Sequence, residues 1–195
     1  LPLPIPEILN HFKDSAATAL RTGEHLSEEI SRSASHVIST LESGGKILIC
    51  GNGGSAADAL HFSAELVVRF ERDRRALAAI ALSADTAAIT ATGNDFDFNQ
   101  IFARQVEALG RTDDHLIVIS TSGNSENISA AVIAAKNISH MRVTALTGRD
   151  GGALKTFLGH EDVELRVPSE STARIQEAHA IIIHVLCTLV DNHFA

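Results

Sequence analysis

A glycine-rich turn that joins an apolar run to a long proline-free stretch constrains the fold more than any other feature of this chain. The run Lys46–Cys50 is typical of a buried strand, and the stretch after Ser55 is typical of a helix. Between them lies the turn GNGGS, residues 51–55. A strand, a glycine turn and a helix in this order aim backbone N–H groups at an anion. We expect the hydroxyl of Ser55 to cap the helix start.

Apolar runs and helix-like stretches alternate along the rest of the chain. The pattern predicts strands at Lys46–Cys50, Leu77–Leu82, Leu116–Ser120, Arg142–Leu146 and Val163–Val167, and helices at Ser55–Glu71, Thr86–Ala91, Phe98–Leu109, Ser125–Lys136 and Thr172–His193. Such alternation is typical of a parallel sheet covered on both faces. We therefore expect an α/β fold, a three-layer αβα sandwich whose five-stranded parallel sheet has the flavodoxin-like order 2-1-3-4-5.

The first part of the chain, residues 7–42, has helical periodicity with a single glycine, Gly23. It predicts two helices that meet near Thr22 and Gly23, or one interrupted helix. The chain has 195 residues, 45% of them hydrophobic, and lacks a Gly/Pro/Ser-rich linker. This is enough to bury one core. We expect a single domain over residues 1–195, with the N-terminal helical region as part of it.

Charge and cysteine content exclude several classes of protein. The net charge is −8, which disfavours binding to nucleic-acid backbones and requires that any phosphate be held by local dipoles. Cys50 and Cys187 lie among apolar residues, so both are interpreted as buried thiols in a reducing compartment. Neither a secretory signal nor an apolar run long enough to cross a bilayer is visible, which favours the cytoplasm.

The predicted strand order places two polar loops beside one crevice. Strands one and three become neighbours whose crossovers leave in opposite directions, and ligands bind outside the carboxyl ends of such strands. The loops there are residues 51–55 and Ser120–Ser125. The second carries three serines and a threonine around one glycine, without the lysine of a Walker loop. It is either a neutral cradle for a phosphate or a serine-rich turn that caps a helix.

His61 and Glu65 are four residues apart on the helix that follows the glycine turn, so they share one face. They are an ordinary partly exposed pair, a metal-binding pair, or a carboxylate base with a polar partner.

The last helix carries Gln176 and His184, eight residues apart. Eight residues correspond to about 80° of rotation and roughly 12 Å of rise. One metal ion could bind both only if the side chains lean together or come from different chains. The alternative is a core helix with a satisfied histidine.

Asn94 and Asp95 lie in the sequence GNDF, which is typical of a turn but also offers an amide and a carboxylate to sugar hydroxyls. Residues 148–152, GRDGG, are interpreted first as a turn.

Together these motifs resemble the sugar isomerase (SIS) domain family, most closely its phosphoheptose isomerase branch. The matching runs are CGNGGSAADALHF, HFSAEL, TGNDFDFNQIF, ISTSGNSENI, ALTGRDGG and ARIQEAH. GNGGS and STSGNS are general to phosphosugar binding, whereas Glu65 together with Gln176 and His184 is the more specific signature.

The resemblance implies a homotetramer with sites at subunit interfaces and a divalent metal ion, commonly Zn²⁺, in each subunit. It assigns Glu65 as the general base and His184 as the general acid. The implied metal ligands are His61, Glu65, Gln176 and His184. The implied substrate contacts are Asn52, Gly53, Gly54, Ser55, Glu65, Asn94, Asp95, Ser120, Thr121, Ser122, Ser125 and Gln176.

The implied reaction converts sedoheptulose 7-phosphate into D-glycero-D-manno-heptose 7-phosphate through a cis-enediol, in the synthesis of the heptose precursor of lipopolysaccharide core. An alternative is a non-catalytic SIS-domain tetramer that associates with the replication initiator protein, which the runs VRFERDR, PSESTARIQEAH and CTLVDNHF also resemble. A phosphosugar-sensing domain is a third possibility, but such domains usually accompany a DNA-binding module. The presence of Glu65 and His184 favours the enzyme.

Overall fold

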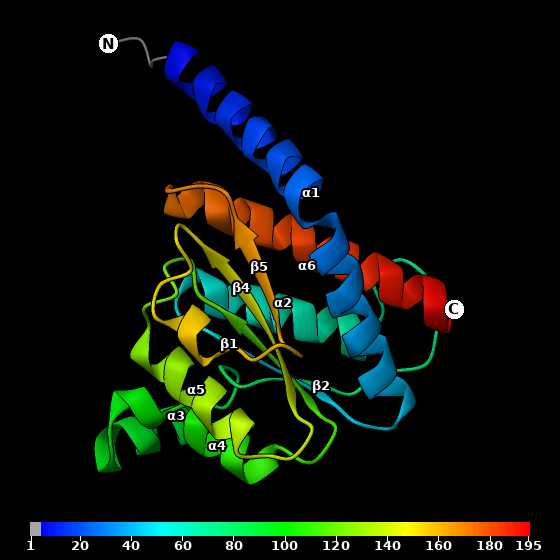
Figure 1. Ribbon diagram of the computed structural model, residues 1–195, viewed down its shortest axis with the longest axis vertical. Coiled ribbons are helices and arrows are strands. Elements are labelled where there is room, and N and C mark those ends of the chain that lie inside the picture. Colours follow the sequence, from blue (N-terminus) through cyan, green and yellow to red (C-terminus); the bar gives the residue numbers. More distant parts are fainter. Residues whose placement is uncertain (1–4) are drawn as a thin grey trace.

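One parallel sheet of five strands, in the order β2-β1-β3-β4-β5, organises the chain (Figure 1). The computed structural model describes residues 5–195; residues 1–4 of the predicted domain lie outside the described part. The strands are β1 (Ile47–Gly51), β2 (Ala79–Ala81), β3 (His115–Ile119), β4 (Arg142–Gly148) and β5 (Val163–Val167). The predicted strand order is confirmed. β2 is shorter than predicted because it is an edge strand paired with β1 alone.

The α-helices are α1 (Ile5–Glu42), α2 (Gly54–Val67), α3 (Thr86–Asp95), α4 (Ala103–Leu109), α5 (Glu126–Lys136) and α6 (Thr172–Phe194). Two 3₁₀ turns, η1 (Phe98–Gln100) and η2 (Leu154–Phe157), complete the elements. α1, α2 and α6 cover one face of the sheet, and α4 and α5 cover the other. The three-layer sandwich is therefore as expected.

The central strands alternate between two cores, because successive side chains of a strand point to opposite faces. Ile47 and Ile49 of β1 pack under α1, α2 and α6, whereas Leu48 and Cys50 pack under α4 and α5. All residues of β1 and β3 are buried. The near-continuous apolar runs in the sequence follow from this double burial.

α1 is one helix of 38 residues, and the predicted break near Gly23 is wrong. Its buried residues recur every three or four positions straight through that point: Thr18, Thr22, Leu26, Ile30, Ser33, Ala34, Val37, Thr40 and Leu41. A glycine inside a helix costs about 1 kcal/mol. Packing along this uninterrupted stripe outweighs that cost. The N-terminal part of α1 extends beyond the sheet, and residues 5–14 are all exposed (Figure 1).

Most other elements begin or end within two residues of their predicted bounds, and the larger differences lie in three helices. The predicted helix Phe98–Leu109 is divided into η1 and α4, because Ile101 and Phe102 turn into the core between them. α3 continues through Asp95, so the residues predicted to form a turn are its last turn. α2 ends at Val67, four residues before its predicted end at Glu71.

α6 is long and apolar enough to cross a membrane by length and composition, contrary to the expectation from sequence. Half of its most apolar window is buried within this fold, as in the core helix of a globular domain. Both thiols are free and buried, as predicted. Burial raises the pKa of Cys187 to about 12 and that of Cys50 still higher.

Candidate functional site

The carboxyl ends of β1 and β3 lie side by side, so the two polar loops meet there. Gly51 pairs with Ile119 at the end of the ladder. Just beyond it, the amides of Asn52 and Asn127 exchange two hydrogen bonds of 2.9 and 2.8 Å. This pairing ties the glycine turn to the first turn of α5, so the two loops lie side by side as predicted.

Hydroxyl and N–H groups crowd the serine loop, residues 120–125. The Oγ atoms of Ser120 and Ser125 lie 3.4 Å apart, and Ser120 Oγ accepts the Gly123 N–H at 3.2 Å. Ser125 is the N-cap residue of α5 but makes no side-chain capping bond. The loop after β4 supports this arrangement, since the Leu154 N–H bonds Gly123 O at 2.9 Å. The loop therefore offers neutral donors to an anion at the start of a helix.

The glycine turn is tighter than the sequence predicted. Gly53 has φ +55° and is the N-cap, so α2 begins at Gly54. Ser55 is a buried residue of the first turn, and the helix start has no side-chain cap, so the predicted capping by Ser55 is wrong. A Cβ added at Gly54 would lie 2.0 Å from Nε2 of Gln176. The Gln176 amide therefore closes over the turn and occupies the space that a side chain at position 54 would take.

A cluster of two imidazoles and a carboxylate lies on the outer faces of α2 and α6. Nε2 of His61 is 3.1 Å from Oε1 of Glu65 and 3.4 Å from Nε2 of His184. The two imidazole rings meet edge to face, with centroids 5.0 Å apart. The side chains of His61 and Glu65 are 40% and 23% exposed, so the cluster is open to a ligand.

This cluster and the Gln176 amide occupy different places in one chain. α2 and α6 run in the same direction, because Gln176 lies over Gly54 near their starts and His184 meets His61 farther along. The rise of a helix separates Gln176 from His184 by roughly 12 Å. A single chain therefore does not bring Gln176 to the other three predicted metal ligands.

The donor types in the cluster suit a divalent ion, but its geometry fits one only in part. Zinc binds imidazole nitrogens and carboxylate oxygens at about 2.0–2.2 Å, so ligand atoms around one tetrahedral ion lie about 3.3 Å apart. The separations of His61 Nε2 from Glu65 and His184 are of this size. Over residues 5–195, however, no group of three or more His, Cys, Asp or Glu side chains forms a complete ligand set.

Asn94 and Asp95 are exposed at the end of α3, where the Asn94 amide donates to Oδ1 of Asp95 at 2.7 Å. Apart from this bond between the two, neither side chain hydrogen-bonds to a predicted site residue within residues 5–195. The adjoining turn η1 is joined to α5, since the amide of Asn99 donates to Glu126 at 2.6 Å.

Two neighbours of the cluster were missed in the sequence. Asp58 precedes His61 by one turn, and its Oδ2 is buried without a hydrogen-bond partner in residues 5–195. Burial raises the pKa of Asp58, although the positive charge of a protonated His61 opposes this. Phe70 stacks on the ring of His184, with centroids 5.3 Å apart. The i, i+3 spacing could have identified Asp58, but no local signal pairs Phe70 with a residue on α6.

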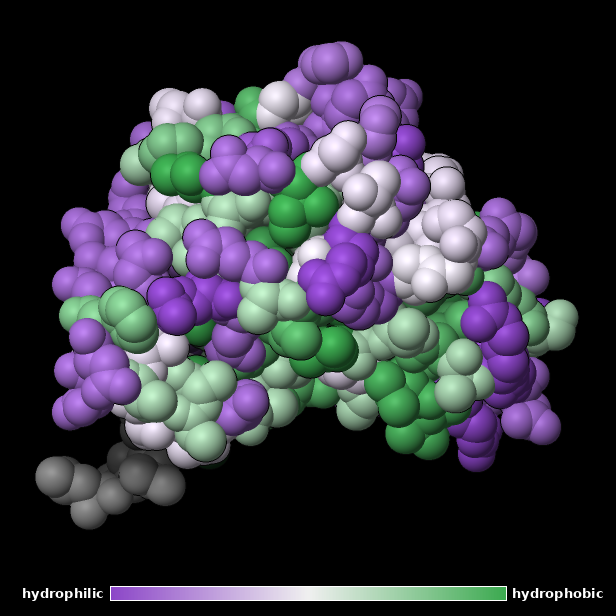
Figure 2. Space-filling model, turned by 90° about the horizontal axis from the view of Figure 1, so that it is seen from below, coloured by the Kyte–Doolittle hydropathy of each residue, from purple (hydrophilic) through white to green (hydrophobic). Residues whose placement is uncertain are grey.

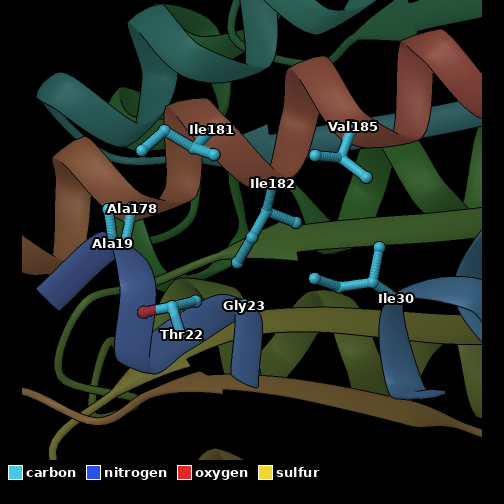
Figure 3. A pocket seen from close by; sticks show the side chains of 8 residues that line it. All are labelled: Ala19, Thr22, Gly23, Ile30, Ala178, Ile181, Ile182 and Val185. Carbon is cyan, nitrogen blue, oxygen red and sulfur yellow. The ribbon is translucent and has the colours of Figure 1, made fainter. Parts of the chain in front are cut away.

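An apolar hollow of about 60 Å³ lies between α1 and α6, apart from these polar groups (Figure 3). Its lining residues are Ala19, Thr22, Gly23, Ile30, Ala178, Ile181, Ile182 and Val185. None of them is a predicted site residue, and only Thr22 contributes a polar side chain.

Known proteins resemble this chain over nearly its whole length. The SIS domain family matches residues 10–148. A phosphoheptose isomerase from Methylibium petroleiphilum is 54% identical over 184 residues, 94% of this chain and 92% of that protein. One from Alteromonas mediterranea is 50% identical over 188 residues, 96% of this chain and 94% of that protein.

Solved structures agree with these sequences. A phosphoheptose isomerase from Francisella tularensis superposes with a TM-score of 0.93 at 48% identity, covering 96% of this chain and 98% of the other. One from Neisseria gonorrhoeae gives a TM-score of 0.90 at 46% identity, with the same coverage.

Proposed function

Because this chain belongs to the SIS domain family and, within it, to the phosphoheptose isomerases, we propose that it converts sedoheptulose 7-phosphate into D-glycero-D-manno-heptose 7-phosphate. The proposal rests on sequence identity of 50% and 54% to phosphoheptose isomerases over nearly the whole chain, together with a carboxylate held beside two imidazoles. The product would serve as the heptose precursor of lipopolysaccharide core.

The serine loop is the proposed phosphate site. The chain carries a net charge of −8, so its overall field repels a sugar phosphate. Local donors must therefore hold the phosphate, and the serine and threonine hydroxyls with the N–H groups at the start of α5 supply them. The Asn52 amide and the turn at Gly53 and Gly54 border the same crevice and would contact the sugar.

Glu65 and His184 carry out the proton transfers in this proposal. Glu65 removes a proton from C1 of the ketose, and the electrons form a cis-enediol. His184 moves a proton between the oxygens on C1 and C2, and Glu65 returns its proton to C2 to give the aldose. General acid–base catalysis of this kind contributes about 10²- to 10⁴-fold to a rate.

The completed site is proposed to form between subunits. Eleven residues of α2 separate Gly54 from Glu65, which corresponds to about 16 Å along the helix axis. One sugar phosphate held at the serine loop of a chain would not reach the Glu65 of that chain. We therefore place the serine loop of one copy opposite the Glu65 and His184 of another, in a homotetramer.

Exposed apolar side chains support this assembly. Ile181 and Val185 flank His184 on the outer face of α6, and Ile8, Leu9 and Phe12 are exposed on α1. The underside of the molecule also carries apolar patches between hydrophilic ones (Figure 2). Covering these surfaces by another copy would remove apolar area from water and enclose the cluster.

His61, Glu65 and His184 are also the residues proposed to hold a divalent ion, one in each subunit, with zinc the best match to their donor atoms. When bound, such an ion would supply a positive charge that polarises substrate oxygens. Gln176 would join these ligands only from another copy. Asn94 and Asp95 would likewise contact the substrate through the assembly.

The four named relatives are all phosphoheptose isomerases, which favours the enzyme over the alternative of a replication-initiator-associating tetramer. We propose a cytoplasmic location, where the reduced state of both thiols fits.

Incubating the purified protein with sedoheptulose 7-phosphate and following aldose formation tests the proposal. We expect turnover, and a loss of at least about a hundredfold in Glu65→Gln. Tight binding of the replication initiator without any turnover would support the alternative instead.

Mixing two inactive variants tests the shared site. Glu65→Gln chains and Ser125→Asp chains, whose added carboxylate repels the phosphate, should regain activity when they are unfolded together and refolded. Some mixed interfaces then carry a native serine loop opposite a native Glu65. If the mixture stays as inactive as its components, each site lies within one chain.

A further inference from the structure

The early end of α2 leaves backbone carbonyls that need partners. Val68 N–H bonds Ala64 O at 2.9 Å, which is the last helical bond. The next two carbonyls accept hydrogen bonds from the guanidinium of Arg74: Nη2 donates to Glu65 O at 2.7 Å, and Nη1 to Leu66 O at 2.9 Å. A helix ends with carbonyls that lack intrahelical partners, and a basic side chain can satisfy them. Arg74 therefore caps the turn of α2 that carries Glu65.

The Arg74 side chain is in turn fixed by a residue of α6. Its Nε donates to Oδ1 of Asp191 at 2.8 Å, and the two side chains are only 1% and 2% exposed. Asp191 follows His184 by seven residues, which is two helical turns, so both lie on nearly the same side of α6. The ion pair joins the two helices whose outer faces carry Glu65 and His184.

The second carboxylate oxygen of Asp191 fixes the segment that covers His184. It accepts the N–H groups of Glu71 and Arg72, both at 2.9 Å. These residues directly follow Phe70, whose ring stacks on the His184 imidazole. One carboxylate thus restrains the backbone of Glu65 through Arg74, and the stacking partner of His184 through two N–H groups.

Stability alone does not account for so specific a pair. Burial raises the pKa of Asp191, but the hydrogen bonds from Arg72, Glu71 and Arg74 together lower it below its usual value. Well-packed apolar side chains of similar volume are often as stabilising as a buried ion pair. Apolar side chains cannot make hydrogen bonds, so they could hold neither the carbonyl of Glu65 nor the backbone N–H groups that follow Phe70.

We propose that the Arg74–Asp191 pair is a positioning device that sets the Glu65 carboxylate against the His184 imidazole. Neither residue touches the substrate, and both act through the residues that they hold. The inference rests on the catalytic roles proposed above for Glu65 and His184.

Kinetics of Arg74→Lys and Asp191→Asn test this device, with Asp114→Asn as the matched control. Asp114 is a buried carboxylate that accepts two backbone N–H groups and pairs with Lys46, far from α2 and α6 in the sequence. We expect the first two variants to lower kcat by about 10- to 100-fold with KM within about twofold, because small displacements of reacting groups are costly. Asp114→Asn should lose comparable stability and keep its kcat.

A nuclear magnetic resonance signal of the His184 ring gives a readout that a merely structural role would not move. In Asp191→Asn the ring protons should shift, because Phe70 no longer stacks as before. Phe70→Leu leaves the ion pair intact and replaces Asp191→Asn in this test if that variant does not fold. We expect Phe70→Leu to lower kcat several-fold and to shift the His184 ring protons in the same way. Unchanged kcat in folded Arg74→Lys, while Glu65→Gln is inactive, would overturn the inference. If Glu65→Gln itself keeps full activity, the proposed roles fail instead.

Discussion

Two histidine clusters in this chain combine similar side chains in opposite environments. His61 and His184 meet on the outer faces of α2 and α6 beside Glu65, where the imidazoles are open to a ligand. The other pair, His36 and His115, lies at the amino edge of the sheet with ring centroids 6.1 Å apart. His115 is fully buried on β3.

The buried cluster is built for structure. Nε2 of His115 lies 2.9 Å from Thr144 Oγ1, which in turn lies 3.1 Å from Ser33 Oγ, so the network joins β3 and β4 to α1. Burial, with smaller contributions from the charges of His36 and Arg142, lowers the pKa of His115 to about 3. This imidazole stays neutral at physiological pH and cannot exchange protons with a ligand. Environment, and not residue type, separates the two clusters.

The sharpest way to break this comparison is His184→Gln. We expect kcat to fall by about 10²- to 10⁴-fold, because the variant loses the proposed general acid. Its melting temperature should stay close to that of the native protein, since His184 is exposed. His160→Gln, at a side chain that is 91% exposed before β5, is the control and should alter neither quantity. A native kcat in His184→Gln would show that the exposed histidine cluster does not take part in catalysis.

The opposite outcome is expected for His115→Ala. Truncating a fully buried side chain leaves a cavity and removes one of the two hydrogen-bond partners of Thr144, which should cost about 3 kcal/mol of unfolding free energy. Urea denaturation measures this loss, and kcat below the transition should be unchanged. A variant with native stability but impaired turnover would contradict the structural role of the buried network.

Acid should destabilise the protein through its buried histidines. An unfolded histidine has a pKa of about 6.5, whereas burial lowers that of His179 to about 4 and that of His115 to about 3. As the pH falls below about 6.5, the unfolded chain gains protons that the folded chain does not bind, so each group costs about 1 kcal/mol per pH unit.

This loss should continue to about pH 4 for His179 and to about pH 3 for His115. Urea unfolding measured from pH 7 to pH 4 tests the slope. His179→Asn should flatten it, and an identical slope in that variant would exclude His179 as its source.

The smallest expected effect lies in the serine loop. Ser122→Ala removes one hydroxyl, which is worth about 1 kcal/mol and should raise KM about fivefold with little change in kcat. Steady-state kinetics separates the two constants. A fall in kcat alone would place the hydroxyl in the chemistry and not in binding.

The sheet could be predicted almost completely, because five apolar runs in alternation with helices leave few topologies. Gly23 was misleading, since its propensity argues for a break whereas the stripe from Leu26 back to Thr18 argues for continuity. Propensity is a local quantity of about 1 kcal/mol, and packing along a whole helix exceeds it. Ser55 does not cap α2, because the chain turns at Gly53 and the helix has already begun at Gly54.

The family resemblance grouped His184 with His61 and Glu65, but from the residues alone the site could be predicted only where its members are close in sequence. His61 and Glu65 follow from their spacing of four, and the separation of Gln176 from His184 follows from helix rise. The meeting of His61 with His184 spans 123 residues, and the pair of Arg74 with Asp191 spans 117. Such contacts depend on how α2 and α6 pack, which no local pattern encodes.

The N-terminal part of α1 extends past every other element (Figure 1), and its side chains Ile8, Leu9 and Phe12 are exposed to water. In a single chain in dilute solution, these apolar side chains stay exposed to water. If neighbouring copies cover these side chains and also complete the catalytic site, dissociation on dilution removes the apolar contacts and the complete site together. Specific activity should then rise with enzyme concentration, so the cell could tune heptose output simply through how much of the protein it makes.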